Sequence, residues 1–530
     1  MRKLPLSKLK QGALKLADES GHGKAFVISY PDKLLTTPYL RPQQQHTFID
    51  YAKFSHQTQS IGLYLHLPFC EQKCSFCNFA VSVNHQEDYQ SNYVDALLYD
   101  MKKFFDLYQG KIHSVDIGGG TPLLLSEKNL IKVSEFLQPI LNKIEDYDPT
   151  KFSFEQTSKL AALHPEKMKA LTSAFPSLPV RTSMGIQSVN QSILADYRRV
   201  TTNIGSEEAN PAENCRRVLP KGSHASADII FPMGELEDFI QTINRTVELQ
   251  FDTITAYDII DNYGGGIRKA FRGKSNVRKE KYGQFYDVWY QKMIQFGYVV
   301  RYGSNNAVKK TKLNEYLLQK GFILSNLTEQ EYLDFAAKFS VSSYYHDRIS
   351  LGNEFIGFGL GASSKLIYNN IPIWSFNHSN IPAWKEERNQ QRNKEQLEKN
   401  YVYSPKFAYS YSFPTKIWMT KDIRYQLGNF GCIQFKHLNE KYRNNFPHLL
   451  KIEDLFEKEI EFVLNQGWME WKEDQRLCLK VGGTYTYLAH IRALLTDDLL
   501  LPGILDLYEK EDVLQQVYAK RQEIEKHLQI

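Results

Sequence analysis

The stretch that decides the fold runs from Tyr64 to Phe79 and reads Tyr-Leu-His-Leu-Pro-Phe-Cys-Glu-Gln-Lys-Cys-Ser-Phe-Cys-Asn-Phe. It holds Cys70, Cys74 and Cys77 in the spacing Cys-x3-Cys-x2-Cys, and these are half of the 6 cysteines in a chain of 530 residues. Three thiolates can bind three irons of a [4Fe–4S] cluster. Because no fourth cysteine lies nearby, the pattern predicts a cluster with one iron open to a ligand from outside the protein.

Zinc is the competing interpretation of the same cysteines. A structural zinc site commonly takes four nitrogen or sulfur ligands, often as two separated pairs. The nearest candidates for a fourth ligand are His66 and His85. The iron–sulfur interpretation is favoured by position, since the three cysteines directly follow an alternating apolar run, Ile61 to Leu67, that predicts a strand.

The bulk composition is that of an ordinary globular chain in a reducing compartment. The net charge of +5 comes from 65 basic and 60 acidic residues and is spread out, which does not favour nucleic acid as a partner. No apolar stretch approaches the ~20 residues of a membrane helix, and the N-terminus lacks the apolar core of a secretory signal. We therefore expect a cytoplasmic protein. Cys215, Cys432 and Cys478 are scattered in the sequence and are expected to be small buried hydrophobes.

Strand-like and helix-like segments alternate after the first strand, which predicts an α/β protein with a parallel sheet and helical crossovers. Polar residues with a binding role should then lie at the carboxyl ends of the strands. The expected strands are 113–117, 152–157, 180–187, 225–231, 253–260 and 298–304. The expected helices are 88–108, 126–144, 165–174, 190–198, 236–249 and 278–296.

The sequence divides into four parts. Residues 1–55 are expected to be an N-terminal arm, 56–375 the core domain, 376–414 a connecting segment with a surface helix, and 415–530 a C-terminal domain ending in a helix over 503–530. Within the last part, helices are expected near 418–428, 434–442 and 452–465, followed by a hairpin of 467–471 and 476–480. A hairpin after helices has the form of a wing, and because no basic stripe accompanies it we interpret it as a lid or packing module.

Several polar or glycine-rich segments follow the expected strands. Gly118-Gly119-Gly120-Thr121-Pro122 follows the second strand, and a run of glycines is needed where the backbone approaches a ligand closely. Glu155, Gln187 and Asp228 stand at later strand ends, and Arg199 follows Gln187. Each of these residues alone is equally compatible with a structural role.

Taken together, these motifs resemble the radical S-adenosylmethionine (SAM) superfamily, and within it the oxygen-independent coproporphyrinogen III oxidase branch. The resemblance extends over about 60–490. It implies a partial (β/α)6-type parallel barrel that carries a [4Fe–4S] cluster, with a C-terminal α+β domain of winged-helix type covering the barrel mouth. It also implies one or two bound SAM molecules and a low-potential electron donor such as flavodoxin or ferredoxin. The implied small-molecule substrate is either related to tetrapyrroles or a natural product that is methylated or cyclopropanated.

The resemblance also assigns roles to residues. Cys70, Cys74 and Cys77 are the implied cluster ligands. The glycine-rich stretch from Phe355 to Ser364 resembles the segment that closes the family's site beside the adenine. The implied cofactor-binding residues are Tyr64, Gly119, Gly120, Thr121, Glu155, Gln187, Arg199, Asp228, Gly361 and Ala362. Acids suit the ribose hydroxyls of SAM, and Arg199 suits its carboxylate.

One departure bears on the substrate. The oxidases carry a fourth cysteine two residues after the third, and Phe79 stands at that position here. Phenylalanine there is typical of haem chaperones, haem-opening methylases and radical methylases or cyclopropanating enzymes of natural-product pathways. We therefore expect an enzyme that cleaves SAM to a 5′-deoxyadenosyl radical acting on a substrate other than coproporphyrinogen III. The alternatives are a haem-binding chaperone without turnover and a coproporphyrinogen III dehydrogenase.

Overall fold

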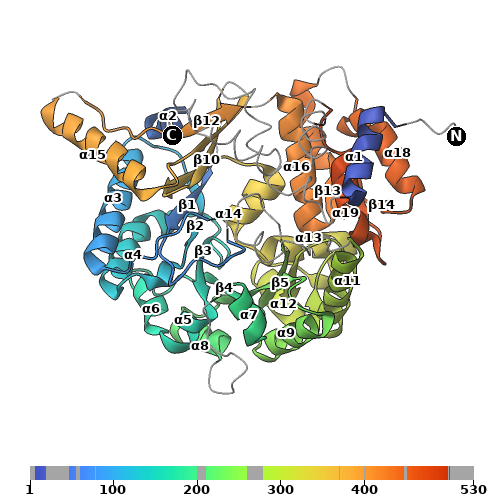
Figure 1. Ribbon diagram of the computed structural model, residues 1–530, viewed down its shortest axis with the longest axis horizontal. Helices are drawn as coiled ribbons and strands as arrows, with labels where there is room; N and C mark the ends of the chain where they lie inside the picture. Colours follow the sequence, from blue (N-terminus) through green and yellow to red (C-terminus); the bar gives the residue numbers. More distant parts are fainter. Residues whose placement is uncertain are drawn as a thin grey trace.

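A single sheet of 12 strands runs through the larger part of the molecule, in the order β12-β11-β10-β9-β1-β2-β3-β4-β5-β6-β8-β7 (Figure 1). The computed structural model describes residues 6–19, 47–54, 60–77, 79–199, 210–259, 279–368, 371–398, 401–412, 414–446, 450–498 and 501. The helix expected over 503–530 lies outside these residues, as does most of the N-terminal arm.

Six parallel strands in sequence order form the centre of this sheet, as the alternating pattern predicts. Each strand from β1 to β6 pairs in parallel with the next. Most of their residues are buried, as in β1 and β5, which is typical of parallel strands covered on both faces. The order of the strands leaves β12 and β7 as edges of the described sheet, so the barrel is partial. The strands are β1 (Ile61–Leu67), β2 (Ile112–Gly119), β3 (Phe152–Thr157), β4 (Arg181–Gln187), β5 (His224–Phe231) and β6 (Thr253–Asp258).

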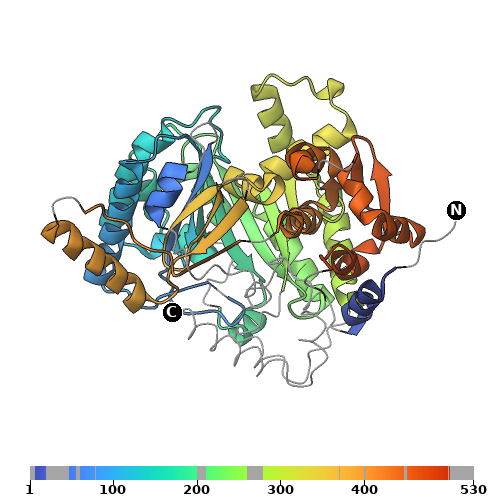
Figure 2. The ribbon, with the colours of Figure 1, turned by 90° about the horizontal axis from the view of Figure 1, so that it is seen from above.

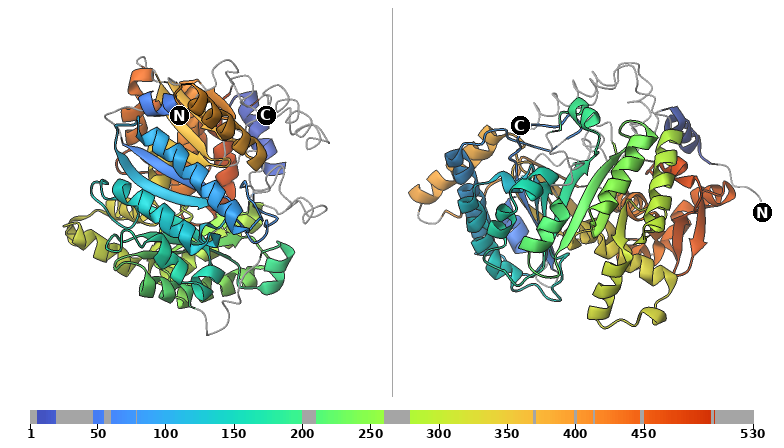
Figure 3. Two further views of the ribbon diagram at one scale, coloured as in Figure 1. Left: turned by 90° about the vertical axis from the view of Figure 1, so that its left-hand side faces the viewer. Right: turned by 90° about the horizontal axis from the view of Figure 1, so that it is seen from below.

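Helices connect these strands and cover their outer side (Figure 3). Most expected helices are confirmed, although two of them are split or shortened. The helix expected over 165–174 is the short α6, preceded by α5, and the one over 190–198 ends early at Asp196. The connecting helices are α3 (Glu87–Phe105), α4 (Glu127–Leu141), α5 (Ser158–Leu163), α6 (Glu166–Leu171), α7 (Gln191–Asp196), α8 (Pro211–Val218), α9 (Leu236–Glu248) and α11 (Lys279–Gln295).

The strand expected over 298–304 is wrong in extent. Only β7 (Tyr298–Val299) forms there, and β8 (Asn306–Lys309) then pairs antiparallel with β6. The chain turns at Gly303, whose φ is +89°, and a Cβ atom there would lie 2.5 Å from the Cα of Gly431. The close contact with the C-terminal domain therefore ends the strand, and a sequence pattern does not carry that information.

The sheet continues beyond β1 through strands that the sequence analysis did not predict. β9 (Phe355–Gly359) pairs in parallel with β1, so the glycine-rich stretch starts as a strand. β10 (Ser363–Tyr368), β11 (Ile371–Phe376) and β12 (Tyr409–Ser412) then follow in antiparallel order. The surface helix expected after 375 is α15 (Ile381–Leu397). Between β8 and β9 lie α12 (Lys310–Gln319), α13 (Glu329–Phe339), α14 (Ser343–His346) and a π-helix, Asp347–Leu351.

The C-terminal domain contains the three expected helices and the hairpin, together with a short strand, β13, that the sequence did not predict. Its three-stranded sheet has the order β13-β15-β14. The elements are α16 (Thr415–Phe430), β13 (Cys432–Gln434), α17 (Phe435–Tyr442), α18 (Glu457–Asn465), β14 (Met469–Lys472), β15 (Arg476–Leu479) and α19 (Leu488–Leu494). Cys215, Cys432 and Cys478 are buried as predicted, but the last two face each other across β13 and β15.

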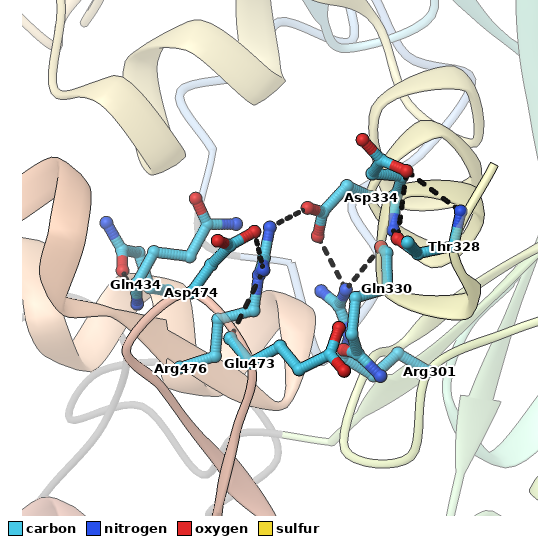
Figure 4. A network of polar contacts seen from close by, with 10 residues as sticks. Arg301, Thr328, Gln330, Asp334, Gln434, Glu473, Asp474 and Arg476 are labelled. Atoms are coloured by element: carbon cyan, nitrogen blue, oxygen red, sulfur yellow. Dashed lines mark hydrogen bonds and ion pairs between the residues drawn. The ribbon is translucent and has the colours of Figure 1, made fainter. Parts of the chain in front are cut away.

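Partly buried ion pairs join the C-terminal domain to the core, and helix α1 (Lys8–Glu19) packs on the C-terminal domain. Asp334 on α13 accepts from Arg301 Nη2 at 2.5 Å and from Arg476 Nη2 of β15, so that one carboxylate bridges two guanidinium groups (Figure 4). Helix α1 packs against α19, and Lys10 Nζ donates to the carbonyl oxygen of Leu494 at 2.5 Å (Figure 2).

Among the described residues, no helix has both the length and the apolar character needed to cross a membrane.

Candidate functional site

The three cysteines lie on the loop that follows β1. Cys74 is buried, and Cys70 and Cys77 are partly buried. Backbone hydrogen bonds fix the loop, including Cys70 N to the carbonyl oxygen of Ser82 at 2.9 Å and Ser75 N to that of Tyr197 at 3.0 Å. Burial raises the pKa of the Cys70 thiol to about 11 and also raises that of Cys77. The thiolate form therefore requires a cation at this site, such as iron.

The arrangement of the cysteines suits a cluster better than a single ion. Among the described residues, no three His, Cys, Asp or Glu side chains converge on one metal ion. An iron–sulfur cube does not require such convergence, because each thiolate binds a different iron. His66 Nε2 hydrogen-bonds to the carbonyl oxygen of Ala80 at 2.7 Å, and His85 is exposed. No zinc site with one of these histidines as fourth ligand is therefore formed among the described residues.

Gly119 and Gly120, at the end of β2, pack directly against the cysteine loop, and we call this pair the glycine ridge. A Cβ atom at Gly120 would lie 2.5 Å from the carbonyl oxygen of Phe69, and one at Gly119 would lie 2.7 Å from the His66 ring. Gly119 also has a φ of +112°, a conformation that favours glycine. The Thr121 hydroxyl lies 3.8 Å from Cys70 Sγ. The close approach predicted for this segment is thus made to the loop that carries the cluster ligands.

Three carboxylates from neighbouring strands line the interior of the barrel. Glu155 of β3 accepts from Gly119 N at 3.4 Å, and Asp228 of β5 accepts from Ser183 Oγ at 2.7 Å. The third is Asp116 of β2. The carboxylate of Glu155 is reached from the cavity although protein surrounds it, and burial followed by the charges of Asp228 and Asp116 raises its pKa to about 7.

Burial acts in the same direction on the other two acids. It raises the pKa of Asp116 to about 7, and it raises that of Asp228 although Arg181 opposes the shift. Three acids at one place repel each other's charge, so a bound cation would stabilise all of them. The sulfonium and ammonium groups of SAM are such cations.

Gln187 and Arg199 form a polar pair beside the cysteines. Gln187 ends β4 with a φ of +68°, and its Oε1 is buried without a partner among the described residues. Arg199 Nη2 donates to the carbonyl oxygen of Gly185 at 2.7 Å, and its Nη1 lies 3.9 Å from Cys74 Sγ. The Nε of Arg199 is also buried without a partner. An unpartnered acceptor and donor next to Cys74 fit a ligand that carries both an amine and a carboxylate.

Tyr64, Gly361 and Ala362 complete the set of predicted residues. Tyr64 stacks on Tyr344 with a centroid distance of 5.7 Å. Burial raises the pKa of Tyr64 well above its ordinary value, so its hydroxyl stays protonated and can donate. Gly361 and Ala362 follow β9, next to β1, and Gly361 N donates to the carbonyl oxygen of His378 at 2.8 Å.

One cavity of about 760 Å³ is lined by every site residue that the sequence analysis named. This volume is within the range of cofactor and substrate pockets. The predicted residues on its wall are Tyr64, Cys70, Cys74, Cys77, Gly119, Gly120, Thr121, Glu155, Gln187, Arg199, Asp228, Gly361 and Ala362. The glycine ridge, the unpartnered polar atoms and the three acids all fit a [4Fe–4S] cluster with SAM.

Other lining residues were missed. Asp116 stands two residues before Gly118 on β2 and so faces the same side, a signal that strand periodicity contains. Tyr257 lies near the end of β6, where a polar residue was to be expected. Tyr344 and Arg348 also line the cavity, but they come from the segment before β9, which carries no motif.

Comparison with known proteins supports the fold of the region that contains the site. The Radical SAM superfamily matches residues 64–257, which span β1 to β6 and include the cysteine loop. Residues 64–257 thus form a Radical SAM domain. Residues that converge on the cavity from β1 to β5 all fall within the matched region.

Curated relatives of this radical SAM protein have haem-related names. It is 30% identical over 206 residues to "Heme chaperone HemW" of Haemophilus influenzae, covering 38% of this chain and 51% of that protein. It is 34% identical over 167 residues to "Anaerobilin synthase" of Escherichia coli O157:H7, covering 31% and 36% respectively. The chain thus spans about half the length, or less, of these relatives.

A solved structure supports the fold over nearly the whole radical SAM chain. It is described as "Coproporphyrinogen III oxidase (HemN) from Escherichia coli is a Radical SAM enzyme" and matches with a TM-score of 0.59 at 14% identity. The match covers 89% of this chain and 96% of the other. At this level of identity the match shows the fold, and the fold is the one that the curated relatives' similarity over the core leads us to expect.

Proposed function

We propose that this chain is an enzyme that cleaves SAM reductively at a [4Fe–4S] cluster and uses the resulting radical on a substrate related to tetrapyrroles. The observation that carries the proposal is that all the residues predicted to bind SAM converge on the cavity that the three cysteines line. A protein that only carried haem would have no need of that set. When bound, the cluster supplies the electron that converts SAM into methionine and a 5′-deoxyadenosyl radical.

The residues of this chain bind and orient the cofactors. Cys70, Cys74 and Cys77 would hold three irons, and Arg199 beside Cys74 would pair with the SAM carboxylate close to the fourth. Gln187 offers its unpartnered oxygen to the SAM amine. Glu155 would accept hydrogen bonds from the ribose hydroxyls in its ionised form.

The cavity also protects a reactive species from water. The cysteine loop, the glycine ridge and the end of β9 form one side of it, and α14 with the following π-helix contributes another. Aromatic side chains contribute to the wall, including Phe76, Tyr257 and Tyr345. Such a wall suits a flat conjugated substrate, which would itself cover the reacting atoms when bound.

The substrate class rests on the relatives. Their printed names refer to haem, to anaerobilin and to coproporphyrinogen III. A tetrapyrrole is therefore the favoured substrate, with hydrogen abstraction or methylation as the reaction. Methylation or cyclopropanation of a natural product is the second possibility within the same chemistry.

A haem-binding chaperone without turnover is the second candidate function. It is favoured by the relatives named as heme chaperones. The two functions differ in one product, since only the enzyme releases 5′-deoxyadenosine in a substrate-dependent manner.

The experiment measures 5′-deoxyadenosine after anaerobic reconstitution and dithionite reduction, with SAM and with haem or coproporphyrinogen III. We expect release by the wild type that haem increases, and none by Cys74→Ala. SAM labelled with deuterium in its methyl group separates the reaction types, because label in both 5′-deoxyadenosine and product indicates methyl transfer. Tight haem binding without any 5′-deoxyadenosine would contradict the enzyme and favour the chaperone.

A further inference from the structure

The acidic side chains and the arginine Arg348 that line the main cavity come from different parts of the fold. Its acids, Asp116, Glu155 and Asp228, come from the barrel strands β2, β3 and β5. Arg348 lines the same cavity but comes from the π-helix that follows α14. Helix α14 lies between the barrel strands and α16 of the C-terminal domain (Figure 1), and Tyr345 donates to Asn429 of α16. Arg348 therefore stands on the side of the cavity nearest the C-terminal domain.

Aromatic rings surround the Arg348 guanidinium. Its Cζ lies 5.4 Å from the ring centroid of Tyr344, 5.7 Å from that of Tyr345 and 5.5 Å from that of Phe355. These distances allow cation–π attraction, which holds the charge in place and keeps water away. Ring faces do not satisfy the five N–H donors of a guanidinium. π-helical turns of this kind are frequent at functional sites.

The neighbouring acids are engaged elsewhere. Asp347 lies 3.3 Å from His113 and 2.9 Å from His346, and Asp116 accepts from Ser342 Oγ at 2.6 Å. Burial lowers the pKa of Arg348, but the phenols of Tyr344, Tyr425 and Tyr345 contribute to a net rise, so the guanidinium stays charged. In the described part of the chain, Arg348 forms no ion pair with a carboxylate.

The hydroxyl of Tyr344 lies beside Arg348 and is buried, in a residue that is only 3% exposed. The charge of Arg348 acts on its oxygen, but no acceptor for its proton lies within hydrogen-bond distance among the described residues. Tyr344 and Arg348 both line the main cavity. A buried donor without a partner costs free energy unless a ligand satisfies it. A carboxylate has two oxygens and would accept from both groups at once.

We propose that Arg348 and Tyr344 bind a carboxylate of the substrate, and that Arg348 thereby selects tetrapyrroles that carry free acid side chains. This inference rests on the proposed function, because it takes the cavity to hold SAM and a tetrapyrrole together. The SAM carboxylate is assigned elsewhere, since Arg199 lies beside Cys74 whereas Arg348 lies beside Tyr344 and Phe355. The cavity thus has carboxylates for the cationic groups of the cofactor and a positively charged arginine for the anionic substrate.

The test compares protoporphyrin IX, which has two carboxylates, with its dimethyl ester. Binding of each to the reconstituted protein with SAM is titrated anaerobically by porphyrin absorbance. We expect the wild type to bind the acid at least about tenfold more tightly than the ester, as befits a charge-assisted contact. Arg348→Gln should bring the two affinities to within about threefold, and Tyr344→Phe, which keeps the ring, should reduce the ratio in part.

Two further variants serve as controls for the charge of residue 348 and for the removal of an arginine elsewhere. Arg348→Lys keeps the charge but not the fork of donors, so it should restore part of the preference for the acid. Arg217→Gln removes an exposed arginine of α8, away from the cavity, and should keep the full wild-type ratio. Iron content and SAM affinity are measured on every variant.

The outcomes separate this inference from the proposed function. Equal affinity of the wild type for acid and ester, or binding of neither, overturns the carboxylate site. The carboxylate site is also overturned if Arg348→Gln leaves the ratio of acid to ester affinity unchanged, or if this variant loses SAM affinity and not that ratio. A protein that prefers the acid through Arg348 but releases no 5′-deoxyadenosine retains the carboxylate site and refutes the enzyme.

Discussion

The affinity for SAM should depend on pH through Glu155. Burial and the charges of Asp228 and Asp116 raise the pKa of this carboxyl to about 7, so it is largely protonated at pH 6 before SAM binds. Binding of a cation favours the ionised form, and affinity should therefore rise as the pH passes through 7. Arg181 and the Gly119 N–H also face Glu155 and favour the same ionised form.

The magnitude follows from the ionised fraction of a single group. With a pKa of about 7 this fraction rises from ~0.09 at pH 6 to ~0.9 at pH 8, so Glu155 alone should change the affinity about tenfold. Glu155→Gln keeps the shape of the side chain and removes its titration. We expect the variant to bind SAM more weakly at pH 8. The slope of the logarithm of its affinity against pH should be lower than that of the wild type by about one.

The assay is anaerobic isothermal titration calorimetry of wild type and Glu155→Gln at both pH values. The amine of SAM titrates in both experiments, and the remaining acids Asp116 and Asp228 are also present in both proteins. The difference between the two slopes therefore reports Glu155 together with its charge coupling to Asp116 and Asp228. Identical slopes for the two proteins would refute the assignment of this carboxylate to the cofactor.

Three further outcomes are expected. Arg199→Ala should weaken SAM binding about tenfold to a few hundredfold with normal iron content, because it removes a charge-assisted contact of ~1.5–3 kcal/mol; unchanged affinity by calorimetry would remove Arg199 from the site. Gly120→Ala should lower the iron content per chain, since its Cβ would lie 2.5 Å from the carbonyl oxygen of Phe69 and displace the cysteine loop; full iron content would contradict this. Because Phe79 stands where the oxidases have a cysteine, the pure protein should convert little coproporphyrinogen III, and efficient decarboxylation measured by product chromatography would restore the oxidase function.

The parts of the site that the sequence predicts are those fixed by local chain order. Cys70, Cys74 and Cys77 share one loop, and Glu155, Gln187 and Asp228 each end a strand of a parallel series. The carboxyl ends of such strands meet at one edge, so position along the chain is enough to bring these residues together. The structure places all of them on one cavity wall.

The parts that the sequence does not predict depend on contacts between distant segments. Arg348 reaches the cavity because the segment between α13 and β9 packs across the barrel, and no motif marks it. The early end of β7 follows from the contact of Gly303 with Gly431, more than a hundred residues away. Likewise, Cys432 and Cys478 become neighbours only when β13 pairs with β15.

The metal content of the reconstituted protein tests the central claim most directly. Iron and acid-labile sulfide are measured after anaerobic reconstitution, for the wild type and for Cys74→Ala, with Cys215→Ala as a control that alters a buried cysteine distant in sequence from the loop. The account predicts about four irons and four sulfides per chain in the wild type and in Cys215→Ala, and loss of the cluster absorbance in Cys74→Ala. One zinc per chain, with no iron retained after reconstitution, would contradict it.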